Sequence, residues 1–153
     1  MENANFNQLV SFVFGIANDC LVDVYDVGDY RKIILPMIVL RRFDAVLEPT
    51  KQAVLAMKQK LAAAGILEQD VALCSVAHEA FCNSSPFTLS DLKSRTNQQQ
   101  LKQDFILYLD GFSKNVQDII TKFEFRNQID KLSEHDILGL LISKFVDPSI
   151  NLS

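Results

Sequence analysis

The chain has 153 residues, of which 48% are hydrophobic and 22% charged, and its net charge is −4 at neutral pH. This composition is typical of one globular domain that folds without metal ions or disulfides, and its acidic balance argues against a free-standing nucleic-acid-binding protein. Three cysteines without a CxxC pair, no signal peptide and no run of about 20 apolar residues predict a cytoplasmic protein with no membrane contact.

Apolar residues at three- and four-residue steps predict a first helix from about Asn5 to Val22. The segment Asp26–Asp29 then supplies turn residues and side-chain caps for the next helix. The apolar run Ile33–Leu40 contains Pro36 and has two interpretations: a buried strand, or part of a helix over Asp29–Leu47 that is buried nearly all round. We favour the helix, because proline removes a ladder hydrogen bond and no second strand pattern lies nearby.

Good helix formers predict a helix over Pro49–Ala64 that ends at Gly65. Another helix is expected over Gln69–Cys82, followed by a loop at Asn83–Pro86. After this loop, Thr88-x-x-Asp91 resembles a capping box, which marks the start of a helix.

The last third of the chain predicts three more helices. The first is closed by Gly111, and its apolar face comprises Leu101, Phe105, Tyr108, Leu109 and Phe112. The second begins near Ser113, and its apolar face comprises Val116, Ile119, Ile120 and Phe123. The third begins at Ser133, has Asp136 at its third position and stops before Pro148. The sequence therefore predicts an all-α fold of about seven helices with no sizeable sheet.

Motifs for catalysis are scarce. The five glycines are scattered, and neither GxGxxG nor GxxxxGK[ST] is present. Cys74, His78 and Cys82 would share one face of the predicted helix over residues 69–82, but the outer two would lie about 12 Å apart, too far for one zinc ion. We interpret them as two core cysteines beside a partly exposed histidine. The alternative is a small metal-dependent enzyme that uses Cys74 and His78.

Charge is distributed unevenly along the chain: residues 1–30 carry −5, residues 31–60 carry +5 and the remainder carries −4. Arg31 and Arg42 are three helical turns apart, so on one helix they point the same way at about 16 Å, and Lys32 and Arg41 widen this strip. One interpretation is contact with a phosphate backbone. The other is that the strip pairs with the acidic first segment, for example with Asp19, Asp23 or Asp26, and joins two helices.

Three segments carry a family resemblance: Asp29-Tyr30-Arg31-Lys32-Ile33-Ile34-Leu35-Pro36 with Leu40-Arg41-Arg42-Phe43-Asp44, then Phe87-Thr88-Leu89 with Asp91-Leu92, and Tyr108-Leu109-Asp110-Gly111-Phe112-Ser113 continuing to Ile129. Together they resemble the N-terminal helical domain of the modification (M) subunit of type I restriction-modification systems. The resemblance covers nearly the whole chain. One departure is Pro86, where the family commonly has glycine.

The resemblance implies a site-specific adenine-N6 DNA methyltransferase that takes its methyl group from S-adenosylmethionine. In this family two M subunits join one specificity subunit on double-stranded DNA, and a restriction subunit can be added. Residues 1–153 would then form a single N-terminal helical domain of a larger subunit. The cofactor motif and the Asn-Pro-Pro-aromatic motif belong to a catalytic domain absent from this chain, so we expect no catalytic, cofactor-binding or metal residue here.

The resemblance also directs the interpretation of the cations. We expect the side chains of Arg31, Lys32, Arg41, Arg42 and Arg126 to face DNA phosphate or a partner subunit. Asn127 and Gln128 are expected to be buried amides that bridge helices. The competing hypothesis is a stand-alone α-helical adaptor without an enzymatic parent. Reading the gene beyond the codon for Ser153 distinguishes the two, because only the first predicts a continuing frame with both methyltransferase motifs.

Overall fold

The computed structural model describes residues 2–147, with the side chains of residues 7–16, 18–26 and 28–147. Within these residues the fold is all-α, as predicted, and its one element of β structure is an isolated antiparallel bridge between Asn83 and Phe112. The helices in chain order are α1 (Glu2–Ile16), α2 (Arg31–Leu47), α3 (Lys51–Ala63), α4 (Asp70–Ala77), α5 (Leu89–Lys93), α6 (Gln98–Asp110), α7 (Lys114–Lys122), α8 (Arg126–Glu134) and α9 (Leu138–Phe145). A π-helical segment, Ala17–Leu21, extends α1, and short 3₁₀ turns at Val27–Asp29 and Glu48–Thr50 flank α2.

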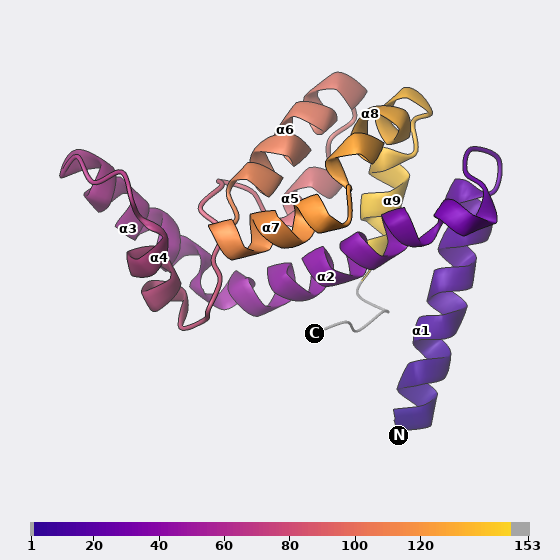
Figure 1. The fold of residues 1–153 in the computed structure, drawn as a ribbon, viewed down its shortest axis with the longest axis horizontal. Coiled ribbons are helices and arrows are strands. Elements are labelled where there is room, and N and C mark those ends of the chain that lie inside the picture. Colours follow the sequence, from indigo (N-terminus) through magenta and orange to yellow (C-terminus); the bar gives the residue numbers. More distant parts are fainter. Residues whose placement is uncertain (1, 148–153) are drawn as a thin grey trace.

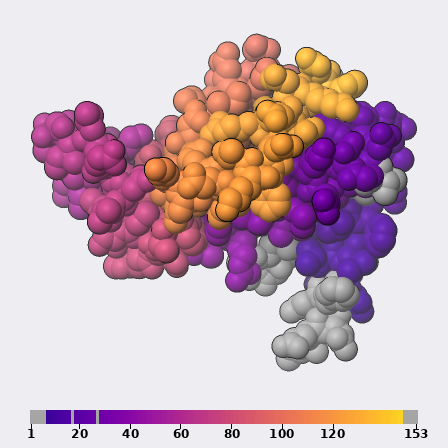
Figure 2. All heavy atoms as spheres, viewed as in Figure 1, coloured from indigo at the N-terminus to yellow at the C-terminus, as the bar shows by residue number. Residues whose placement is uncertain are grey.

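The long helix α2 runs along one side of the molecule, and helices α5 to α9 form a compact group beside it (Figure 1). Two parts project from this group. Helix α1 extends from one end of α2, and α3 packs against α4 to form an arm at the other end. Figure 2 shows the far end of this pair projecting at the left, while its base lies against the rest of the molecule. We call this pair of helices the α3–α4 arm.

Helix α9 is at the centre of the core because its sequence offers apolar side chains in nearly every direction. Four of its eight residues, Leu138, Leu141, Ile142 and Phe145, have no exposed surface. The helix packs against α2, α5, α6 and α8. Burial on several sides is what stabilises so short a helix, which would be marginal in isolation.

Helix α2 runs unbroken through Pro36, which confirms the helix over Ile33–Leu40 and excludes the strand. Pro36 lies inside α2, beyond its first turn, so the carbonyl of Lys32 lacks its usual helical donor, and Pro36 lines a small hollow with residues of α7 such as Val116 and Ile120. The expectation of near-complete burial was wrong, since Leu35 is 44% exposed.

The turn before α2 is present, but the predicted side-chain cap of α2 is not. The N-cap residue is Tyr30, which forms no capping hydrogen bond.

Two helix boundaries and one whole helix differ from the sequence prediction. Helix α4 ends at Ala77 instead of Cys82, because His78 adopts a left-handed conformation with φ 59°. The last helix begins at Leu138 instead of Ser133, because Ser133 belongs to α8 and Asp136 has φ 57°. Helix α8 itself was not predicted as a separate element. These breaks let α4 pack against α3, and α8 and α9 pack against each other.

Two glycines end helices by different means. Gly65 has φ 75° and follows α3 directly, as predicted. Gly111 caps α6 in ordinary helical geometry with φ −75°, and its role is steric. A Cβ atom at Gly111 would lie 2.5 Å from the backbone nitrogen of Ser85 and 3.0 Å from Oδ1 of Asn83. The absent side chain therefore permits close contact between the end of α6 and the segment before α5.

Candidate functional site

The three segments that carry the family resemblance meet at the carboxylate of Asp44, on the inner face of α2. Its Oδ1 accepts a hydrogen bond from the backbone N–H of Leu89 at 3.1 Å and another from the hydroxyl of Tyr108 at 2.9 Å. Leu89 is the first residue of α5, so Asp44 also satisfies an unpaired amide at the start of that helix. Asp44 is 6% exposed and Tyr108 is 1% exposed. One carboxylate thus joins α2, α5 and α6.

A second buried polar group lies close by on α3. The Nζ of Lys51 donates a hydrogen bond to Oδ1 of Asn83 at 2.8 Å and lies 3.4 Å from Oγ of Ser85. The Nδ2 of Asn83 in turn donates to the backbone carbonyl of Tyr108 at 2.9 Å. We call Asp44, Lys51, Asn83, Ser85 and Tyr108 the polar centre. It ties the base of the α3–α4 arm to α6.

Burial dominates the protonation of the polar centre. Desolvation raises the pKa of Asp44, opposed by the hydrogen bonds from Leu89 and Tyr108 and by the charges of Arg41 and Lys51. Desolvation lowers the pKa of Lys51 to about 8, although Asp44 and Asp91 oppose this shift. Burial and the Asp44 carboxylate hold the pKa of Tyr108 well above its usual value, so its hydroxyl stays a hydrogen-bond donor at neutral pH. The groups whose pKa values are shifted belong to a structural hydrogen-bond network, and we see no pair among them arranged for acid-base catalysis.

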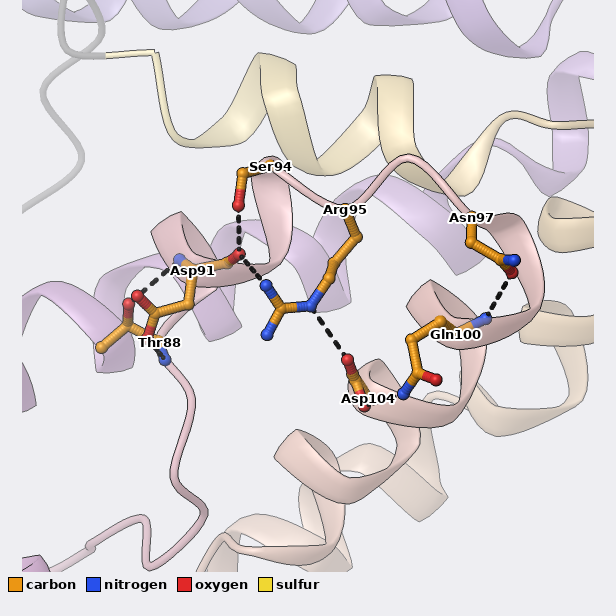
Figure 3. Close-up of polar contacts among 7 residues, drawn as sticks. All are labelled: Thr88, Asp91, Ser94, Arg95, Asn97, Gln100 and Asp104. Atoms are coloured by element: carbon orange, nitrogen blue, oxygen red, sulfur yellow. Dashed lines mark hydrogen bonds and ion pairs between the residues drawn. The ribbon is translucent and has the colours of Figure 1, made fainter.

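A neighbouring network fixes the geometry between α5 and α6 (Figure 3). Thr88 and Asp91 form the predicted capping box at the start of α5, and Asn97 caps α6 through the backbone N–H of Gln100. Arg95 spans the gap: its Nε donates to Oδ2 of Asp104 at 3.0 Å, and its Nη1 lies 3.4 Å from the carbonyl of Asp91. The capping box explains how a helix of only five residues forms.

Arg41, one of the predicted contact residues, turns into the protein. Its Nε donates to the carbonyl of Phe145, the last residue of α9, at 2.9 Å, and its Nη1 lies 3.8 Å from Oδ2 of Asp44. Its side chain is 17% exposed. A cation at a helix C-terminus satisfies an unpaired carbonyl and the helix dipole. The geometry therefore gives Arg41 a role in packing α9 on α2.

Arg31 and Lys32 are exposed at the start of α2, and the fold places them beside a third cation. Together with Lys122, at the end of α7, they line a groove of about 340 Å³ whose other walls are Leu35, Phe123 and Glu124. Lys32 also pairs with Asp29 at 3.3 Å, a closer neighbour than the acidic residues considered from the sequence. We call Arg31, Lys32 and Lys122 the cationic groove.

The other predicted residues occupy separate places. Arg42 is exposed on α2. Arg126 is partly exposed and its Nη2 lies 2.8 Å from Oδ1 of Asp110 and from Oε1 of Gln117, so it is held in a local network. Asn127 is exposed and Gln128 is partly exposed, so the expectation of two buried amides was wrong. Contact of Arg31, Lys32, Arg41, Arg42 and Arg126 with DNA or a partner stays a prediction.

Sequence reasoning missed the residues that the structure uses most. Asp44 and Tyr108 were part of the resemblance, but nothing in their spacing indicated that they bond to each other across 64 positions. In the sequence, nothing distinguishes Lys51 from an ordinary solvent-exposed lysine at the start of a helix. Lys122 lies 90 positions from Lys32, so only the packing of α7 on α2 brings them together. The one hint of the polar centre in the sequence was Asp44, an acidic residue that directly follows Arg41, Arg42 and Phe43.

A larger hollow, of about 580 Å³, lies between α1 and α2 and is lined mainly by apolar side chains, among them Phe14, Val22 and Ile38. Within residues 2–147, no three His, Cys, Asp or Glu side chains gather closely enough to hold a metal ion. None of the helices in that part of the chain combines the length and apolarity that a membrane span needs.

The described residues define an all-helical domain whose three family-resembling segments meet at a buried polar centre, with a separate cationic groove on its surface. Its sequence matches the family described as HsdM N-terminal domain over residues 9–145. The chain therefore belongs to this family, the N-terminal domain of the M subunit of type I restriction-modification systems. No curated protein and no solved structure matches the chain significantly.

Proposed function

We propose that this domain helps to assemble a type I restriction-modification complex around DNA, as part of an M subunit whose catalytic domain methylates adenine at N6. The observation that carries the proposal is the family match over residues 9–145. The partners are a specificity subunit, a second M subunit, a restriction subunit and double-stranded DNA. The complex is expected in the cytoplasm, where its DNA is found.

The hollow between α1 and α2 does not suit S-adenosylmethionine. Its lining is mostly apolar, and Arg31 is the one charged residue among those that line it. It has no carboxylate for the ribose hydroxyls of the cofactor. We therefore place cofactor binding and methyl transfer in the catalytic domain, and assign to this domain a role in binding and positioning.

The cationic groove is the surface we propose for phosphate contact. Arg31 and Lys122 are exposed and have no hydrogen-bond or ion-pair partner among the described residues, and Lys32 is 45% exposed beside its ion pair with Asp29. Exposed cations from two helices suit the backbone-positioning contacts that proteins make with DNA without reading its sequence. Arg42 extends the surface along α2. Arg41 is not included, because its guanidinium is bonded inside the fold.

The test uses the full-length M subunit in the reconstituted complex. Changing Arg31, Lys32 and Lys122 together to alanine should weaken DNA binding and lower the slope of log K against log salt by up to about 2.7, since each lost phosphate contact accounts for about 0.9. The matched control changes Lys60, Lys93 and Lys114 to alanine, which removes the same charge from exposed positions elsewhere. The control should leave the slope unchanged.

Two outcomes would oppose this assignment. Equal DNA affinity and equal slope in both triple variants would show that the groove does not contact phosphate. Failure of the groove variant to assemble, seen as missing subunits by native mass spectrometry, would show instead that the groove binds a partner subunit.

A stand-alone adaptor is the competing function, and it would be supported if the reading frame after Ser153 lacked both methyltransferase motifs.

A further inference from the structure

Two of the three cysteines face each other across a turn that the sequence did not predict. Cys74 lies on α4, Cys82 lies in the segment that follows it, and their Sγ atoms are 3.1 Å apart. Both are free thiols, as is Cys20, which is buried beside α1. In an unbroken helix the two sulfurs would lie about 12 Å apart along the axis. The left-handed conformation of His78 reverses the chain after Ala77 and brings Cys82 back to Cys74.

We propose that Cys74 and Cys82 are a reversible oxidation site, which forms an intramolecular disulfide when the protein meets a peroxide or a low-molecular-weight disulfide. A disulfide needs a sulfur separation of about 2.05 Å, so the two side chains must approach by roughly 1 Å. Side-chain rotation within a turn supplies a movement of this size. The site is independent of the cationic groove and of the proposed function.

The two thiols have different roles in the reaction. Cys74 is partly exposed, so its thiolate reaches a dissolved oxidant first. With hydrogen peroxide, the Cys74 sulfur attacks one oxygen, the O–O bond breaks, and the products are a sulfenic acid and water. The sulfur of Cys82 then attacks the Cys74 sulfur, the S–O bond breaks, and a second water leaves with the Cys82 proton. Two thiols and one peroxide give one disulfide and two waters.

With a low-molecular-weight disulfide, Cys74 displaces one thiol and Cys82 displaces the other. Cys82 suits the second step in both routes. It is 1% exposed, which denies the oxidant direct access. Burial and the neighbouring Cys74 also raise the pKa of its thiol, so it is a poor first nucleophile.

The bond would connect the α3–α4 arm to the body of the protein. Cys82 is anchored in the body, because its backbone N–H donates to Oγ of Ser113 at 3.2 Å and its carbonyl accepts from the N–H of Ser113 at 2.9 Å. The next residue, Asn83, forms the bridge to Phe112. Cys74 is on α4, which packs against α3 and projects with it (Figure 1). Oxidation would therefore restrict motion of the arm.

The experiment treats the full chain with hydrogen peroxide and, separately, with oxidised glutathione, and maps each cysteine by differential alkylation and peptide mass. The expected product is a disulfide between Cys74 and Cys82, lighter by two hydrogen atoms and restored by reductant; because no Lys or Arg lies between them, cleavage after Glu79 is used to obtain the linked peptide pair. Cys20 should stay a thiol. The Cys20→Ser variant should give the same product, which excludes exchange through the third cysteine.

A Cys82→Ser variant should instead retain glutathione on Cys74, because the second displacement is lost. If this buried substitution prevents folding, the partly exposed Cys74→Ser variant, with its fold checked by circular dichroism, should abolish the cross-link. Recovery of all three thiols, or a disulfide that includes Cys20 or a second molecule, would overturn the proposal.

Hydrogen exchange tests whether the disulfide restricts motion of the arm. Amides of α4 should exchange more slowly after oxidation, and unchanged exchange would refute this effect.

Discussion

Helix α2 carries cations at both ends of one continuous helix, yet the two ends have opposite environments. At the N-terminal end, Arg31 and Lys32 are exposed and line the cationic groove. Towards the C-terminal end, Arg41 is 17% exposed and bonds to the last carbonyl of α9 and to Asp44. The difference arises from what packs against each end, since α9 covers the second end and not the first.

The residues that carry the family resemblance fall into two kinds. Arg41, Asp44 and Tyr108 belong to the segments that identify the family, and the structure uses them to join α2, α5, α6 and α9. Arg31 and Lys32 belong to the same segments, and the fold gives them no comparable internal task. Residues of the first kind are expected to control stability, and residues of the second kind are expected to control binding.

The largest effect should come from Asp44→Ala. This change leaves the amide of Leu89 and the hydroxyl of Tyr108 buried without an acceptor and removes the partner of Arg41, at a cost of about 3 kcal/mol in the free energy of unfolding. Asp44→Asn keeps an acceptor oxygen and should lose less. Urea denaturation measures both, with exposed Asp118→Ala as a control that should change stability by no more than about 0.5 kcal/mol. Equal losses in both Asp44 variants would contradict the role of its oxygen as acceptor.

Gly111→Ala should cost about 2 kcal/mol, because the new methyl group would overlap backbone atoms that cannot move independently. Its Cβ would lie 2.5 Å from the Ser85 nitrogen. Gly15→Ala is the matched control on the projecting α1, where no atom lies within 4 Å. There alanine should raise stability by up to about 1 kcal/mol, since it favours the helix. Thermal or urea denaturation of both variants should therefore give shifts of opposite sign.

Arg41→Ala compared with Arg31→Ala tests the two ends of α2 directly. Loss of the Arg41 bonds to Phe145 and Asp44 should lower the free energy of unfolding by about 2 kcal/mol. Arg31→Ala should change it by no more than about 0.5 kcal/mol, because no internal contact is lost. The order should reverse for the salt dependence of DNA binding by the assembled complex. A larger stability loss from Arg31→Ala would refute the assignment of the two ends.

The sequence was sufficient for the fold class because each helix shows its own apolar period locally, and the capping box and Gly65 marked two boundaries correctly. The boundaries that were wrong share one cause. His78, Glu124 and Asp136 all have positive φ, at 59°, 56° and 57°, and none is glycine. Sequence rules assign this conformation mainly to glycine. His and Asp adopt it more often than most other residues, but too rarely for His78 or Asp136 to mark a helix end.

The candidate site was harder to predict because its geometry depends on contacts between distant segments. Whether Arg41 faces solvent depends on the carbonyl of Phe145, 104 positions away. The third cation of the groove, Lys122, comes from α7, far from Arg31 and Lys32 in the sequence. Local spacing predicted a strip of cations along one side of α2, but Arg41 turns into the protein. The spacing contained no information about which helix would cover part of that side.

The smallest effect concerns pH and the buried Lys51. Its pKa is about 8 in the folded protein and 10.5 when unperturbed. Between these values the unfolded chain binds more protons at Lys51, so its contribution to the free energy of unfolding rises as the pH increases from 8 towards 10.5. Tyr108 and Cys82, whose pKa values are raised by burial, act in the opposite direction as they titrate in the unfolded chain. The Lys51 contribution must therefore be isolated by difference.

Lys51→Met keeps most of the side-chain volume and removes the titrating group. The stability difference, wild type minus Lys51→Met, should increase from pH 8 to pH 10 in urea denaturation, because the contributions of Tyr108 and Cys82 cancel. Lys60→Met, at an exposed position on the same helix, is the control and should give a flat difference. A flat difference for Lys51→Met as well would mean that its ammonium group is as well solvated as that of Lys60, contrary to its burial against Asn83 and Ser85.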